Sequence, residues 1–236
     1  MEDYIILIFI GVIAIVILIS SFFNKKAVVK RKLKQAKHKR ISEFLNDDTA
    51  RITGIVELVG EPLVAPLSKR ICAYYHVLVE IKKSTGNNRR WQTHIEEEES
   101  GKFLIKNEFG YAYINANKIK SYIVKDKNYS SGFFNDAKKH LENYLASHGK
   151  ESEGLLGFNK TLRYKEGILE PDEKVAVLGK GQWKDAEVLG LPEKYGRVLE
   201  MSNYIKNEVY LSDDPDTTSN KKQKSIFSKI IDILTK

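Results

Sequence analysis

The sequence has little cysteine and proline and lacks the common motifs of metal-binding and nucleotide-binding domains. Its 236 residues include one cysteine, Cys72, which excludes an intrachain disulfide and zinc sites of the cysteine-rich kind. Five prolines and 15 glycines without a repeat exclude a collagen-like or low-complexity chain. The phosphate-binding motif G-x-x-x-x-G-K-[ST] is missing, although Gly179-Lys180-Gly181 follows a predicted strand. We therefore expect no cofactor, no metal ion and no catalytic residue, and we do not expect an enzyme.

Acidic residues are missing from one stretch of the chain, and this stretch carries nearly all of the net charge. Residues 24–40 hold nine Lys and Arg and no Asp or Glu. The whole chain has a formal net charge of +8, and residues 41–236 contribute only +1. A body this close to neutral predicts no binding of nucleic acid.

The preceding segment explains the basic stretch. Tyr4 to Phe23 is an uncharged run of 20 residues, YIILIFIGVIAIVILISSFF. A helix of this length rises about 30 Å, the thickness of a bilayer's hydrocarbon core. A cleaved signal peptide is the alternative, but it needs a basic start, a shorter apolar stretch and a small-x-small cleavage site. The sequence therefore predicts one transmembrane anchor over residues 1–24.

The basic segment predicts the orientation of this anchor. Positive residues gather on the cytoplasmic side of membrane helices, so we expect a single-pass protein of the cell membrane with its C-terminal domain in the cytoplasm. Anionic lipid head groups are the expected partners of this segment. Apolar residues at helical spacing from Val29 to Leu45 predict a juxtamembrane stalk over residues 25–48, ending at Asn46-Asp47-Asp48. The residues expected at the membrane surface are Lys25, Lys26, Lys30, Arg31, Lys32 and Lys34.

Alternation of apolar and polar residues dominates residues 49–211 and predicts many short strands. From Ile71 to Ile81, apolar residues occupy every second position, which is typical of a strand with one buried face. A hairpin loop at residues 84–88 leads to a second strand with Trp91 and Ile95. Helical spacing returns once, over residues 134–147 before Gly149. Further strands are predicted near 51–59, 103–107, 111–114, 119–124, 162–170, 174–179, 197–201 and 208–211.

Many strands with one helix predict a mainly β domain of the α+β class, barrel-like or sandwich-like, behind the membrane helix. The side chains expected in its core are Tyr75, Val77, Val79 and Trp91 from the strands and Phe134, Leu141 and Leu145 from the helix. Residues 212–236 predict a polar linker and a short amphipathic helix, which either lies on the membrane or docks on its own domain.

The candidates for chemistry are weak. His76 and His94 lie on adjacent predicted strands, but two histidines without a third ligand make a poor metal site. The acidic run Glu96–Glu99 is expected to be a solvated strand end or loop. Cys72 lies within an apolar strand pattern, which predicts a buried thiol rather than a nucleophile.

Several short motifs follow one another in order through the predicted β domain. They are Thr53-Gly54-Ile55-Val56-Glu57, Pro62-Leu63-Val64-Ala65-Pro66-Leu67-Ser68, Cys72-Ala73-Tyr74-Tyr75, Trp91, Phe103-Leu104-Ile105, Phe109-Gly110, Leu162 to Pro171 and Val175 to Gly179. This series resembles the BAM ("beside a membrane") or GIDE domain of the mitochondrial ubiquitin ligase activator family, which are membrane-bound RING-type E3 ubiquitin ligases with bacterial and archaeal relatives. The motif residues are Gly54, Pro66, Leu67, Ser68, Cys72, Tyr75, Trp91, Gly110 and Gly179.

The departures from that family decide what the resemblance implies. The eukaryotic members carry a second membrane helix and a RING finger, which binds two zinc ions through about eight Cys and His ligands, whereas this chain has one cysteine. We therefore expect a prokaryotic, RING-less member that acts as a non-catalytic interaction or sensing module for an unknown protein partner. Two alternatives stay open. One is a ligase-family protein that takes part in ubiquitin transfer, and the other is an envelope stress or structural protein that binds lipid or peptide.

Overall fold

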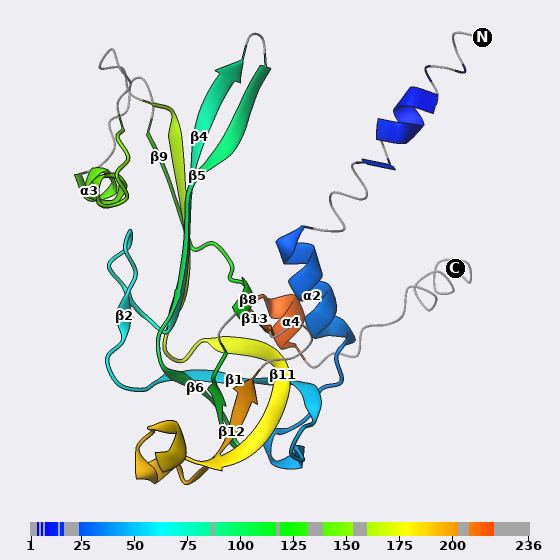
Figure 1. The fold of residues 1–236 in the computed structure, drawn as a ribbon, viewed down its shortest axis with the longest axis vertical. Coiled ribbons are helices and arrows are strands. Elements are labelled where there is room, and N and C mark those ends of the chain that lie inside the picture. Colours follow the sequence, from blue (N-terminus) through cyan, green and yellow to red (C-terminus); the bar gives the residue numbers. More distant parts are fainter. Residues whose placement is uncertain are drawn as a thin grey trace, which may run out of the picture.

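Strands dominate the computed structural model (Figure 1). A closed barrel is joined to a long four-stranded sheet that projects away from it. The mainly β architecture predicted from the sequence, with a barrel and sandwich-like sheets, is thereby confirmed. The structure describes residues 4, 6, 8–13, 15–16, 24–85, 88–116, 119–131, 139–152, 160–202 and 208–219.

Five strands close the barrel, because β1 pairs with β6 on one side and with β11 on the other. Around the ring the order is β1–β6–β7–β12–β11, and the β7–β12 pair is parallel. Apolar side chains such as Ile52, Phe103 and Leu199 fill the interior and are almost completely buried. The five strands are β1 (Thr49–Leu58), β6 (Phe103–Asn107), β7 (Gly110–Ile114), β11 (Lys174–Asp185) and β12 (Arg197–Ser202).

Helix α2 (Lys25–Gln35) and two short strands cover one side of β11. Strand β13 (Val209–Ser212) pairs with β11, and β8 (Ile119–Tyr122) pairs with β13. Val29 and Leu33 of α2 are fully buried. They pack in one cluster with Ala176, Leu178 and Tyr210. Helix α4 (Pro215–Thr218) contacts α2. The other short helical turns lie elsewhere: η1 (Ile41–Glu43) precedes β1, and η2 (Glu187–Leu189) and η3 (Glu193–Tyr195) lie between β11 and β12.

The predicted basic stalk is α-helical only in its first part, although it also contains the short turn η1. Helix α2 ends at Gln35, and Ala36 already has an extended backbone. The chain then runs beside β1, where His38 forms a parallel bridge with Arg51. The start of the β domain at residue 49 stays a prediction. Helix α2 precedes this boundary but packs in one hydrophobic cluster with strands that follow it.

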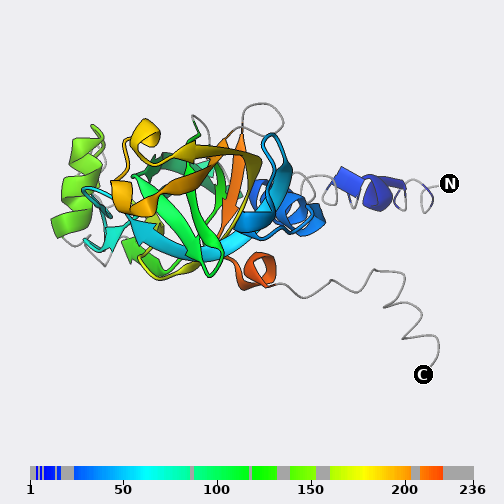
Figure 2. The same ribbon diagram turned by 90° about the horizontal axis from the view of Figure 1, so that it is seen from below.

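The projecting sheet has the order β5–β4–β10–β9 and one apolar face. Helix α3 (Lys139–Ser147) and the β2–β3 hairpin (Leu63–Val64 and Ile71–Cys72) cover that face with side chains such as Leu141 and Leu145. Figures 1 and 2 both show α3 on the opposite side of this sheet from α2. The four strands are β4 (Tyr74–Thr85), β5 (Asn88–Ser100), β9 (Lys127–Ser131) and β10 (Leu162–Leu169).

Most predicted core residues are buried, with one exception. Tyr75, Val77, Val79, Leu141 and Leu145 are at most 5% exposed, as expected. The expectation for Trp91 was wrong, since its side chain is 36% exposed on the projecting hairpin. Phe134 and the start of the predicted helix lie outside the described residues, as does the predicted C-terminal helix beyond residue 219.

Among the residues that the structure describes, no helix combines the length and the apolar character that crossing a bilayer requires. Residues 1–3, 5, 7, 14 and 17–23 of the predicted anchor lie outside the described residues.

Candidate functional site

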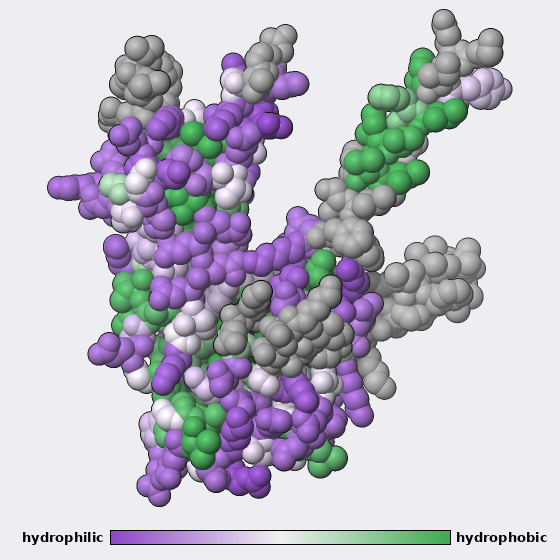
Figure 3. Space-filling model, in the orientation of Figure 1, coloured by the Kyte–Doolittle hydropathy of each residue, from purple (hydrophilic) through white to green (hydrophobic). Residues whose placement is uncertain are grey.

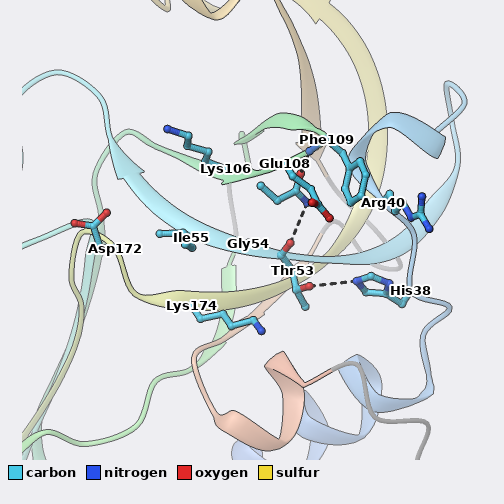
Figure 4. A pocket seen from close by; sticks show the side chains of 11 residues that line it. His38, Arg40, Thr53, Gly54, Ile55, Lys106, Glu108, Phe109, Asp172 and Lys174 are labelled. Carbon is cyan, nitrogen blue, oxygen red and sulfur yellow. Dashed lines mark hydrogen bonds between the residues drawn. The ribbon is translucent and has the colours of Figure 1, made fainter.

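A groove opens where β1 changes its pairing partner. Strand β1 pairs with β11 up to Ile55 and with β6 from Ile55 onward. Gly54 lies next to this change of partner, and a Cβ atom on it would lie 2.5 Å from the carbonyl oxygen of Lys106. Only glycine permits that approach of β1 to β6. The groove has a cavity volume of about 430 Å³ and runs across Thr53, Gly54 and Ile55 (Figure 4).

Polar side chains from distant parts of the chain fix the walls of this groove. His38 Nε2 lies 3.2 Å from Thr53 Oγ1, and Asn107 Nδ2 donates to the Thr53 carbonyl over 3.2 Å (Figure 4). Burial and the nearby Arg51 charge lower the pKa of His38, so its ring is neutral at pH 7. Arg40 stacks over the Phe109 ring at 4.9 Å.

The groove continues along β1 into a second cavity of about 440 Å³, which shares Ile55, Lys106 and Asp172 with the first. Taken together, the two cavities are lined by charges of both signs. The cations are Arg40, Lys106 and Lys174, and the acids are Glu57, Glu108 and Asp172. Ile55 offers an apolar surface, being 46% exposed. The described residues that line the groove include no cysteine or serine that could act as a nucleophile. They also include no acid and base within hydrogen-bond distance of each other, which is the arrangement that would indicate catalysis. The arrangement suits binding of an extended, partly apolar segment.

A second polar cluster joins α2 to the projecting sheet. Ligand atoms of His76, Glu96 and Glu98 lie close enough together to hold a metal ion. However, Lys25 forms an ion pair with Glu98, and Lys125 Nζ contacts both His76 Nδ1 and the His76 carbonyl. Two ammonium groups thus already balance the two carboxylates, which makes a divalent cation unnecessary for charge neutrality. The cluster therefore fits a structural link better than a metal centre.

Burial and hydrogen bonds determine which side chains of this cluster are charged at neutral pH. Burial lowers the pKa of His76, so the ring stays neutral, and it lowers the pKa of Lys125 to about 8. Burial alone would raise the pKa of Glu98, but hydrogen bonds from Lys25 and Tyr74 bring it below its ordinary value. His94 does not belong to the cluster, since the β4–β5 register pairs His76 with Glu98 and skips His94.

The acidic run was expected to be solvated, and this was only partly right. Tyr144 donates a hydrogen bond of 2.6 Å to Glu97. The Tyr75 hydroxyl lies 2.6 Å from Glu97 and 2.5 Å from Glu99, so its single proton is shared between these two carboxylates. Glu98 is part of the link to α2 described above. The run therefore fastens α2, α3 and β4 to β5.

A buried carboxylate brings several motif residues together. Glu166 of β10 is fully buried and accepts hydrogen bonds from the backbone N–H groups of Leu67 (2.8 Å) and Ser68 (2.9 Å). Cys72 lies beside it, fully buried as expected. Burial and the Glu166 charge raise the pKa of its thiol to about 11, which argues against a nucleophile. Pro66, Leu67, Ser68, Cys72 and Tyr75 thus surround a structural junction.

The remaining motif residues lie apart from that junction. Gly54 forms the groove floor, and Gly110 adopts a φ of +129° where β6 turns into β7. Gly179 of β11 leaves room for the carbonyl of Ser202, which a Cβ atom would approach to 2.9 Å. Trp91 lies on the projecting hairpin. The structure therefore brings five motif residues together and leaves four at separate places.

Four of the predicted membrane-surface residues contact other parts of the protein: Lys25, Lys26, Lys30 and Lys34. Lys30 Nζ lies 2.9 Å from both Asp214 and Asp216, and Lys34 lies 3.4 Å from Asp216. Lys26 lies 4.6 Å from the centre of the Tyr122 ring. With the Lys25–Glu98 pair, part of the positive charge of α2 thus docks the helix on the domain.

A second basic segment was missed in the sequence. Residues 81–95 carry Lys82, Lys83, Arg89 and Arg90 and no acidic residue. These four basic residues lie on the outer parts of β4 and β5. Averaging charge over residues 41–236 concealed this segment, and counting charge in short windows would have found it.

Comparisons with family models, with curated proteins and with solved structures found no match for this chain. The BAM or GIDE resemblance therefore stays a prediction from the residues alone.

Proposed function

We propose that this chain is a single-pass membrane-anchored interaction module without catalytic activity, whose β domain presents the groove at Gly54 on the cytoplasmic side. The exposure of apolar side chains near the start of the chain is the observation that supports the anchor. The described residues between 4 and 16 are helical, and their nine large apolar side chains are 47% to 74% exposed (Figure 3). Apolar surface of this extent is unfavourable in water by about 25 cal/mol per Å². A bilayer removes that cost.

The resemblance to the BAM or GIDE family agrees with a domain held beside a membrane. Ligase activity has weaker support, because one cysteine cannot supply the zinc ligands of a RING finger. We propose an extended peptide of a protein partner as the ligand of the groove, with acidic residues that face Arg40, Lys106 and Lys174.

The anchor is tested by placing charge in it. We expect the full-length protein to stay with membranes in carbonate and to need detergent for release. The double variant Ile10→Lys and Ile15→Lys should be released, because each charge at mid-membrane costs about 3 kcal/mol. Ile71→Lys is the matched control, since Ile71 is 52% exposed on the β domain. Release of the wild type by carbonate, or a mature chain that begins near residue 24, would contradict the anchor.

The groove is tested by photo-crosslinking in intact membranes. A benzophenone amino acid at Ile55 should give a defined crosslinked protein, and Lys174→Glu should reduce that product several-fold by repelling an acidic segment. The control position is Val188, which is 74% exposed and does not line the groove. Equal products from both positions would show that contact is non-specific.

A further inference from the structure

The β4–β5 hairpin has two faces of different character. Alternate residues of a strand point to opposite faces, and residues paired across strands share a face. The register pairs Lys82 with Trp91 and Glu80 with Arg163, so these four lie on one face. His76 and Glu98 belong to the same face, and Glu98 binds Lys25 of α2. We name this surface the α2-side face; α3 covers the opposite side of the sheet (Figure 1).

The outer part of the α2-side face is basic and carries an exposed aromatic ring. Its cations are Lys82, Arg89, Arg163 and Lys165. Its acids are Glu80, which lies 2.5 Å from Arg163 and 2.8 Å from Lys165, and Glu96, which lies in the same cross-strand row as Lys165, so the positive charge is in excess. The Trp91 ring is 36% exposed, with the Arg163 guanidinium 4.3 Å and the Lys82 ammonium 6.0 Å from its centre. Tryptophan flanked by cations is typical of surfaces at the head-group level of a membrane.

The α2-side face begins where the chain comes from the predicted anchor. The uncharged run ends at Phe23, and Lys25 at the start of α2 pairs with Glu98 on this face. From His76, opposite Glu98, β4 continues to Thr85, a rise of about 30 Å at 3.3 Å per residue. The N-terminal end of α2 and the outer ends of β4 and β5 point toward the same end of the molecule (Figure 1). The basic face therefore begins beside the start of α2 and extends toward the end of the molecule to which the start of α2 points.

We infer that the α2-side face of the β4–β5 hairpin lies on the anionic head groups of the membrane that anchors the chain. Lys82, Arg89 and Arg163 contact lipid phosphates, and Trp91 inserts at the interface. The inference rests on the proposed anchor and adds a second contact, which fixes how the β domain is oriented. Nucleic acid also presents phosphates, but the position at which the chain would enter the bilayer favours lipid.

Trp91 reports this contact directly, because the chain has two tryptophans. The full-length Trp183→Phe protein is placed in nanodiscs of phosphatidylcholine with or without phosphatidylglycerol, prepared with brominated lipids that quench tryptophan. We expect Trp91 to be quenched and blue-shifted in the anionic discs. Lys82→Gln with Arg89→Gln should shift the equilibrium away from contact by roughly 30-fold and abolish the quenching. Lys83→Gln with Arg90→Gln is the control, because these residues pair on the opposite face of the same hairpin.

Each outcome decides the inference. Discs that carry the protein with unquenched Trp91 overturn it and leave the anchor intact. Failure to co-elute with discs overturns the anchor and the inference together. Equal loss of quenching in both double variants overturns the assignment to one face. Tighter binding of the full-length protein to single-stranded DNA than to anionic discs at equal salt, lost in the Lys82 and Arg89 variant, assigns the face to nucleic acid instead.

Discussion

Replacing Val77 by aspartate is expected to unfold the projecting sheet. Val77 is completely buried in β4, and its register partners on either side are Glu97 and Glu166. The new carboxylate would be buried without a cation and between two existing carboxylates. Burial of an unpaired charge of this kind costs about 4 kcal/mol or more, which is a large part of the stability of a domain.

The matched control is Val64→Asp, the same substitution at a position that is 55% exposed on the β2–β3 hairpin. We expect it to change the free energy of unfolding by no more than about 0.5 kcal/mol. Urea unfolding of the full-length proteins in detergent, followed by circular dichroism, measures both. Similar midpoints for the two variants would show that this face of β4 is not a core face.

Single strands could be predicted because one buried face leaves a local period of two. Strand β6 was placed at its exact residues, and Tyr75, Val77 and Val79 were assigned correctly to the core of β4. The order of the strands could not be predicted in this way. The barrel closes through the β1–β11 pairing, whose partners lie far apart in the sequence, and no local pattern encodes that contact.

Trp91 was assigned to the wrong face because β5 contains one extra residue, which interrupts its alternation of buried and exposed side chains. Counted along β5, Trp91 and Ile95 have the same parity and were expected to share a buried face. The register shifts between Val79 and Glu80, so that Ile95 pairs with Val79 but Trp91 pairs with Lys82. This bulge places the two side chains on opposite faces, with Ile95 7% and Trp91 36% exposed.

The groove could be predicted only in part. Gly54 was singled out as a motif residue, but its role depends on Lys106 of β6, which approaches it through the fold. His38, Asn107 and Asp172 come from three segments far apart in the sequence, and only Asn107 belongs to a strand, as the last residue of β6. Their convergence is a consequence of the barrel, so sequence patterns alone contain no signal for it.

Replacing Asp213 by asparagine is expected to stabilise the protein above neutral pH. Asp213 accepts a hydrogen bond from the Val124 N–H over 2.9 Å, and an asparagine carbonyl can accept the same bond. Burial, together with the charges of Glu173 and Asp126, raises the pKa of Asp213 to about 7 from an ordinary value of 3.8. The folded protein therefore holds a proton on this group that the unfolded chain has released. Its contribution to stability is complete below pH 4 and is lost as the pH rises to about 7.

The asparagine variant removes this loss, so its advantage should be near zero at pH 4 and about 2 to 4 kcal/mol at pH 8. Asp214→Asn is the adjacent control and should act in the opposite direction. Asp214 pairs with Lys30 at 2.9 Å and caps α4 by accepting from the Asp216 N–H, so its charge stabilises the fold. Unfolding midpoints of the three full-length proteins at pH 4 and pH 8 measure these effects. An Asp213→Asn protein less stable than the wild type at pH 8 would show that this carboxylate is ionised at no cost, and that the acidic neighbours do not oppose its charge.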